Sequence, residues 1–216
     1  MVIRKLRKIE RGTVIMWGAY MQLWDELPLL NQSTIESTGS PAAKGEEAPS
    51  EDQVQQWRNE SAFNARCLQS GAGSWDNYAM RALASALESD DWPAPHLRCE
   101  ILAATQWLIY SSPTLIRWAK ENDEDFAQGE VVNWERDVQP GPLFHGREGL
   151  SVGRWNFWKE RLESLLQSPP DHLFVEDVHG SMSLALERMK IAEKEDAERP
   201  EDVESGEVGI PNESGD

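Results

Sequence analysis

Cysteine is scarce in this 216-residue chain, which holds only Cys67 and Cys99. So few cysteines exclude a disulfide-stapled scaffold and indicate a reducing compartment. We expect both thiols to be buried as small hydrophobic groups, because neither is paired with a histidine in a catalytic arrangement. The length fits one domain with its own core, or one domain plus a tail.

Long apolar runs are also missing. No stretch reaches the roughly 20 consecutive apolar residues that a bilayer-spanning helix needs. Basic residues at 4–11 and the apolar run 13–17 weakly resemble a signal peptide, but Gly18 interrupts the run and no small-residue cleavage site follows. We therefore expect a cytoplasmic protein without membrane association, and a nuclear location is the alternative that stays open.

Positive charge is in the minority, with 21 lysines and arginines against 38 aspartates and glutamates and a net charge of −17. An acidic surface repels phosphate backbones and anionic lipids. We therefore expect neither nucleic acid nor a membrane among the partners. Acidic residues are dense at the C-terminal end, and residues 199–216 are predicted to form a disordered acidic tail.

Signatures of catalysis and cofactor binding are absent. The chain has no HExxH zinc motif, no Walker pattern and no GxSxG elbow, and the glycines at 71–73 follow a helical segment rather than a strand. His172, Glu176 and His179 share one face of the last predicted helix, but they fall short of a converging zinc-ligand set. We predict no catalytic residue, no cofactor and no metal, and whether the protein is an enzyme stays open.

Strand signals are lacking as well, since no run alternates apolar and polar residues between hairpin turns. Every apolar segment instead shows the helical period. We predict an all-α fold, an irregular bundle of about seven helices in a single domain over residues 1–198, with a flexible loop near 37–50. Two of the predicted helices are short pieces within 2–27. The next two run from Ser50 to the glycines at 71–73 and from Ser74 to about Leu87, and a further one begins at Pro95, restarts or kinks at Ser112-Pro113 and finishes near Trp118. The last two run from Ser151 to Gln167 and from about Asp171 to Glu198. Residues 121–148 are predicted to be a long connection.

Tryptophan is abundant, with ten residues in the chain. The densest stretch begins at Gly149, where Ser151 is a suitable N-cap and Trp155, Trp158 and Leu162 share one helical face. A candidate ligand or partner patch consists of Arg154, Trp155, Trp158 and Arg161 with His145 of the preceding loop. In the alternative interpretation the tryptophans are core, and the arginines pair with carboxylates such as Glu148 or Glu163.

This stretch and several blocks share their pattern with a known family. The blocks are Leu23–Pro28, Trp57–Arg66, Tyr78–Leu83, Ala103–Tyr110, Gly141–Gly146 and Gly149–Arg161. They resemble a large family of filamentous-fungal helical proteins that is catalogued only as a domain of unknown function. The resemblance covers roughly residues 20–192, although Leu150 stands where phenylalanine is usual. It implies a helical fold and a fungal intracellular setting, and it implies no activity, cofactor or site residue.

Two classes of function stay open. The leading interpretation is a non-catalytic intracellular helical protein with an interaction or regulatory role and an unknown protein partner, which a contiguous exposed aromatic patch would support. The alternative is an enzyme or small-ligand-binding protein, accessory to a fungal biosynthetic pathway, with an aromatic-lined pocket. Its lining would be Trp107, Tyr110, Trp155 and Trp158, around a cavity of roughly 300 Å³ or more.

Overall fold

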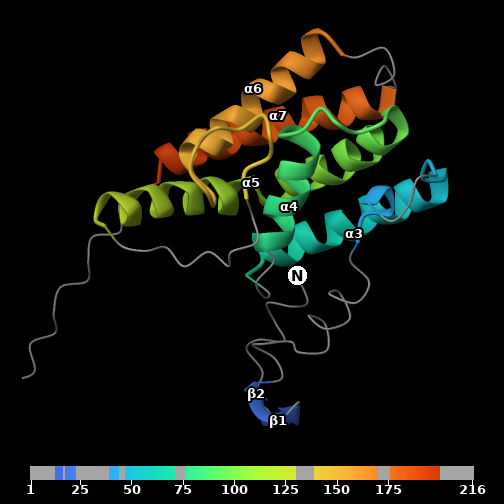
Figure 1. Ribbon diagram of the computed structural model, residues 1–216. Helices are drawn as coiled ribbons and strands as arrows, with labels where there is room; N and C mark the ends of the chain where they lie inside the picture. Colours follow the sequence, from blue (N-terminus) through green and yellow to red (C-terminus); the bar gives the residue numbers. More distant parts are fainter. Residues whose placement is uncertain are drawn as a thin grey trace, which may run out of the picture.

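The computed structural model describes residues 13–16, 18–22, 39–43, 47–71, 76–129, 139–169 and 176–199. Its body consists of five α-helices (Figure 1), which are α3 (Glu51–Gln69), α4 (Asp76–Leu87), α5 (Ala94–Ala127), α6 (Val152–Gln167) and α7 (Glu176–Ala197). The predicted all-α class is confirmed. The predicted number of about seven helices is wrong, because the described residues contain five.

A short antiparallel hairpin lies where two helical pieces were predicted. Strand β1 (Thr13–Met16) pairs with β2 (Ala19–Gln22), and Ile15 stands opposite Tyr20. The turn contains Gly18 at a φ of +80°, which is a conformation that glycine adopts without strain. The β-branched residues before the turn favour extended backbone. These local preferences, rather than the apparent helical period, decide the backbone of the described part of residues 2–27.

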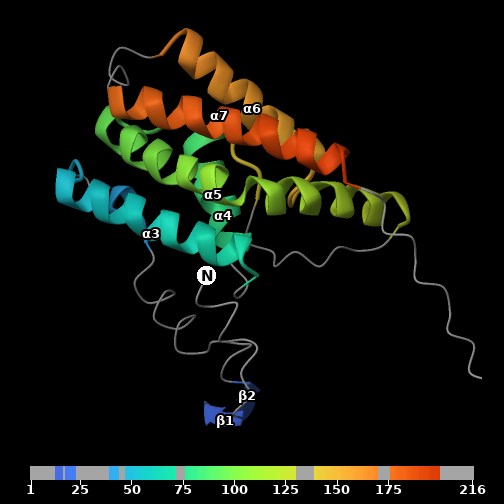
Figure 2. The ribbon, with the colours of Figure 1, turned by 180° about the vertical axis from the view of Figure 1, so that it is seen from behind.

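Helix α5 is the centre of the body. Figures 1 and 2 show α3, α5, α7 and α6 in successive layers, and α5 packs against α3, α4, α6 and α7. Its sequence is apolar nearly all round, which is typical of a helix covered on every side. The residues buried along its first half include Ile101, Leu102, Ala103, Ala104, Trp107 and Leu108.

Helix α5 does not end near Trp118 but runs through Pro113 to Ala127. Residues 121–127, the first part of the predicted connection 121–148, are therefore helical. Proline at 113 lacks the N–H that would bond the carbonyl one turn earlier. The hydroxyls of Ser111 and Ser112 donate to the carbonyls of Trp107 (2.6 Å) and Leu108 (2.5 Å) beside that break. Beyond the proline, continued burial of the apolar face stabilises the helix against its local cost.

Local start signals were predicted correctly for two helices. Ser50 caps α3 in a capping box with Gln53, and the Ser151 hydroxyl accepts a hydrogen bond from the backbone N–H of Arg154 at the start of α6. Helix α7 is described from Glu176. Its predicted start at about Asp171 and the predicted tail beyond Arg199 lie outside the described residues.

Part of the predicted loop near 37–50 packs on the body. A 3-10 turn, η1 (Pro41–Ala43), contacts α3 and α5, and Ala42 is buried. The Ser40 hydroxyl donates a hydrogen bond to the carboxyl group of Glu100 in α5. The low apolar content of this segment predicted a loop that does not pack. The composition gave no sign of the polar contact with Glu100, which joins the segment to α5.

Candidate functional site

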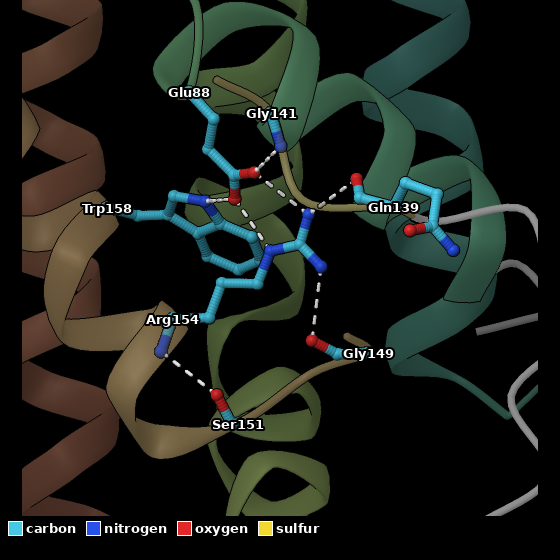
Figure 3. A network of polar contacts seen from close by, with 7 residues as sticks. All are labelled: Glu88, Gln139, Gly141, Gly149, Ser151, Arg154 and Trp158. Carbon is cyan, nitrogen blue, oxygen red and sulfur yellow. Dashed lines mark hydrogen bonds and ion pairs between the residues drawn. The ribbon is translucent and has the colours of Figure 1, made fainter. Parts of the chain in front are cut away.

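A buried ion pair joins the end of α4 to the start of α6 (Figure 3). Both side chains, Glu88 and Arg154, are 0% exposed. The Arg154 Nε donates to Glu88 Oε1 at 2.6 Å, and its Nη2 donates to Oε2 at 2.9 Å. Trp158, one turn further along α6, donates its Nε1–H to Glu88 Oε1 at 2.7 Å. Such a bidentate, charge-assisted arrangement fixes both position and orientation.

The same pair holds the loop that leads into α6. Arg154 also donates to the carbonyls of Gly149 (3.1 Å) and Gln139 (3.3 Å). The Gly141 N–H in turn donates to Glu88 Oε2 at 2.7 Å. The ion pair therefore binds the loop of residues 139–151 near both of its ends, at Gln139 and Gly141 and again at Gly149.

Gly141 is required at this contact by its lack of a side chain. A Cβ atom at this position would lie 2.6 Å from the Cβ and 2.7 Å from the backbone oxygen of Glu88. Two residues later, the Leu143 N–H donates to that same backbone oxygen at 2.9 Å. The loop thus approaches the end of α4 backbone to backbone.

The remaining members of the predicted patch lie in different places. Trp155 is 0% exposed and donates its Nε1–H to Glu193 of α7 at 2.8 Å, while Lys159 donates to the same oxygen at 2.6 Å. Arg161 pairs with Asp90, and His145 is exposed on the loop. The five residues therefore do not converge on one surface.

The contacts around Trp155 also lower the pKa of a carboxyl group, that of Glu193. Burial alone would raise the pKa of Glu193, but hydrogen bonds from Lys159 and Trp155 and the nearby lysine charges more than offset it, so the pKa lies below its usual value. Of the two carboxylates suggested by sequence proximity, Glu163 pairs with Lys190 of α7, and the two arginines form ion pairs with Glu88 and Asp90. Their partners follow α4, 66 residues before Arg154 in the case of Glu88.

A pocket of about 350 Å³ opens beside the ion pair. It lies between the end of α4, the turn into α5 and the 139–151 loop. Its lining consists of Ala84, Ser85, Ser89, Asp91, Trp92, Gln139, Gly141 and Pro142. The expected lining was different, since Trp107, Trp155 and Trp158 are buried in the core, and Tyr110 stacks against the Arg66 guanidinium at 3.6 Å.

Two buried titratable side chains of α5 lie behind the pocket lining. The Trp92 ring stacks on His96 at 6.4 Å between centroids, with a 13° interplanar angle, and its Nε1–H donates to the Ser85 carbonyl at 2.8 Å. Glu100 follows His96 by one turn, and the two are 2% and 5% exposed, respectively. Burial raises the pKa of Glu100, against the opposing effect of hydrogen bonds from Ser40 and Ser85.

Sequence reasoning missed these two residues and Glu88. Only Glu100 carried a signal, a carboxyl group directly before the apolar run 101–104, whereas Glu88 is followed by the polar residues 89–91. Such a side chain must find partners inside the fold. The Nδ1 atom of His96 is buried and has no hydrogen-bond partner among the described residues.

Metal-ligand and membrane signals add nothing to this site. Among the described residues, no three or more His, Cys, Asp and Glu side chains are grouped as a metal site would require. Glu176 and His179 are exposed on α7, and His172 lies outside the described part of the chain. Within the described ranges, no helix is both long and apolar enough to cross a bilayer.

Comparison with known proteins identifies a family to which the chain belongs. A family model described as "Protein of unknown function (DUF3632)" matches residues 1–162. Neither a curated protein nor a solved structure matches the chain significantly. The matched region contains the whole pocket lining and both members of the buried ion pair.

Proposed function

Because the chain belongs to the DUF3632 family of proteins of unknown function, we propose its function from the geometry: it is a non-catalytic binding protein that holds a small molecule in the pocket between α4 and the 139–151 loop. The observation that carries this proposal is that the fully buried, bidentate ion pair of Glu88 and Arg154 holds one wall of the pocket, the loop segment at Gly141, in place. A wall held in place before binding reduces the ordering cost that binding must overcome.

The size and lining of the pocket support the proposal. A volume of about 350 Å³ falls within the usual range of small-molecule sites. Apolar surface from Ala84, Trp92 and Pro142 alternates with the polar groups of Ser85 and Asp91. Small-ligand sites typically combine a mostly apolar wall with a few polar groups that orient the ligand.

We assign no catalytic role to the buried acid and imidazole. Neither Glu100 nor His96 lines the pocket, and their contacts with Ser85 and Trp92 place them behind the lining. A general acid or base must come within hydrogen-bond reach of the reacting atom. The pair therefore supports the lining rather than contacting a ligand.

The test is a small-molecule screen in which the pocket itself is filled. Substituting Ala84→Phe places a ring in the pocket, and Ala127→Phe adds the same ring at an exposed site on α5. We expect hits that raise the melting temperature of the wild type and of Ala127→Phe but not of Ala84→Phe. If no compound stabilises the wild type, or if the hits stabilise Ala84→Phe equally, the proposal is wrong.

An interaction or regulatory role is the second candidate, and the hairpin favours it. Ile15 and Tyr20 are 66% and 80% exposed and stand directly opposite each other on one face of the two strands. Contiguous exposed apolar patches mark partner surfaces, and these two adjacent side chains form a small contiguous patch. Replacing both with serine should abolish capture of a protein partner from the native host while leaving pocket binding intact.

We further place the protein in the cytoplasm. Cys67 and Cys99 are both free and buried, which fits a reducing compartment. Its resemblance to fungal proteins makes an accessory role in a fungal biosynthetic pathway the setting to examine first. Fractionation of the native host that recovers the protein in a secreted fraction or in an organelle other than the nucleus would contradict this proposal.

A further inference from the structure

The charges around the pocket are unequally neutralised. Glu88 is bound by Arg154, and Asp90 is bound by Arg161. Asp91 is the one charged side chain in the lining, and no ion pair joins it to another described residue. Both arginines of α6 are bound to other carboxylates, and the described lining holds no positive side chain to neutralise Asp91.

The aromatic wall is held in a defined orientation. The Trp92 Nε1–H bond to the Ser85 carbonyl fixes the edge of the indole, and stacking against His96 fixes one of its faces. An indole ring attracts a cation through its negative face, more strongly than any other aromatic side chain does. Trp92 and Asp91 are sequence neighbours in the same lining, so both attractions act within one small pocket.

The charge of the whole chain acts in the same direction. Its net charge is −17, and such a potential raises the local concentration of cations and lowers that of anions. An anionic ligand would have to lose its hydration beside Asp91 without a positive partner in the lining, which is costly. A cationic ligand would also lose hydration in the pocket, but the negative charge of Asp91 would attract it and offset this cost.

We propose that this pocket binds a small organic cation, a compact ammonium compound whose alkylated cationic head lies against Trp92 and Pro142 and near the carboxylate of Asp91. This inference rests on the proposed function, because it names the class of ligand for the same pocket. It goes further in predicting that charge, rather than shape alone, decides which molecules are bound.

The test uses three probes of nearly equal shape and different charge: choline, its neutral isostere 3,3-dimethylbutan-1-ol, and the anion 3,3-dimethylbutanoate. Isothermal titration calorimetry at low ionic strength should show choline binding about tenfold or more tightly than the neutral isostere, and no binding of the anion. Raising the salt concentration should weaken choline binding, since screening acts on a partly exposed carboxylate.

Two matched variants locate the effect. Asp91→Asn should weaken choline binding about fivefold and leave the affinity for the neutral isostere unchanged. Asp90→Asn removes the same charge one residue away, outside the lining, and should change choline binding by less than about twofold. Both positions are exposed, so neither substitution should unfold the protein.

The outcomes separate this inference from the proposed function. Equal binding of choline and its neutral isostere, both blocked by Ala84→Phe, would overturn the cation preference and leave the ligand pocket standing. No binding of choline at millimolar concentration, with other compounds blocked by Ala84→Phe, would have the same meaning. Choline binding that survives Ala84→Phe would place the cation elsewhere and overturn the inference, and no binding of any compound would overturn both.

Discussion

Removing Glu88 should be among the most damaging single changes to this fold. Its carboxylate accepts hydrogen bonds from Arg154, Trp158 and the Gly141 backbone, all inside the protein. Glu88→Ala would leave the Arg154 charge buried without its counter-ion. Breaking one partner of a buried pair costs about 3–5 kcal/mol, and each orphaned donor adds about 1–3 kcal/mol. The total is therefore at least about 5 kcal/mol, which is a large part of the stability of an ordinary domain.

The assay is urea denaturation followed by far-ultraviolet circular dichroism, which gives the free energy of unfolding for each variant. The cycle of Glu88→Met, Arg154→Met and the double variant measures the coupling between the two side chains. We expect the double variant to be more stable than the sum of the single changes predicts, by about 2 kcal/mol or more, because it leaves no uncompensated buried charge. It should remain below the wild type, since Trp158 and Gly141 still lose their acceptor.

The matched control is the neighbouring pair of Asp90 and Arg161. Asp90 is 61% exposed, so its ion pair should contribute no more than about 1 kcal/mol. If Glu88→Ala costs as little as the loss of Asp90, or if the Glu88–Arg154 coupling is near zero, then the pair does not fasten the loop. The proposed role of the ion pair in shaping the pocket would then fail with it.

Three further predictions concern single side chains. Trp158→Ala removes a buried ring and should destabilise the protein by about 3–5 kcal/mol, whereas Ser151→Ala removes only a helix cap and should cost about 1 kcal/mol. A cost below about 1 kcal/mol for Trp158→Ala in chemical denaturation would contradict its place in the core. Burial raises the pKa of Glu100 above its ordinary value of 4.5, so the protein loses stability from this group as the pH rises from below 4.5 toward the folded-state pKa. Glu100→Gln should therefore gain stability relative to the wild type as the pH is raised from 4.5, and a difference that does not change with pH would refute the shift. Burial raises the pKa of Cys67 and brings that of Cys99 to about 12, so native protein should react with a thiol reagent at pH 8 far more slowly than unfolded protein, and fast labelling would show that the thiols are accessible.

Local signals in the sequence predicted several features correctly. The caps at Ser50 and Ser151 depend on contacts within three residues, and the segment after Leu97, apolar nearly all round, has the composition of a central helix. Local reasoning failed beyond Pro113, where the helix was predicted to finish near Trp118 but continues to Ala127. The cost of the missing hydrogen bond is local, but the burial that outweighs it comes from other helices.

The hairpin shows the reverse failure. Apolar residues over 14–24 mimic a helical period, and the prediction gave that period more weight than the β-branched run and the turn at Gly18. Four-residue strands are too short for alternation to stand out. The prediction was wrong here because two local signals competed and the weaker-looking one decided the backbone.

The amino-acid sequence by itself determined the helical class, the caps and the central position of α5, because these depend on period and on neighbours within one or two turns. Only the tertiary structure decided which carboxylate meets Arg154 and which residues line the pocket. Glu88 lies 66 residues from Arg154, and the pocket lining comes from two segments separated by the whole of α5. No local pattern encodes a partner at that distance, because a buried guanidinium states only that some acceptor must be found. Packing of the helices around α5 is what brings that acceptor to it.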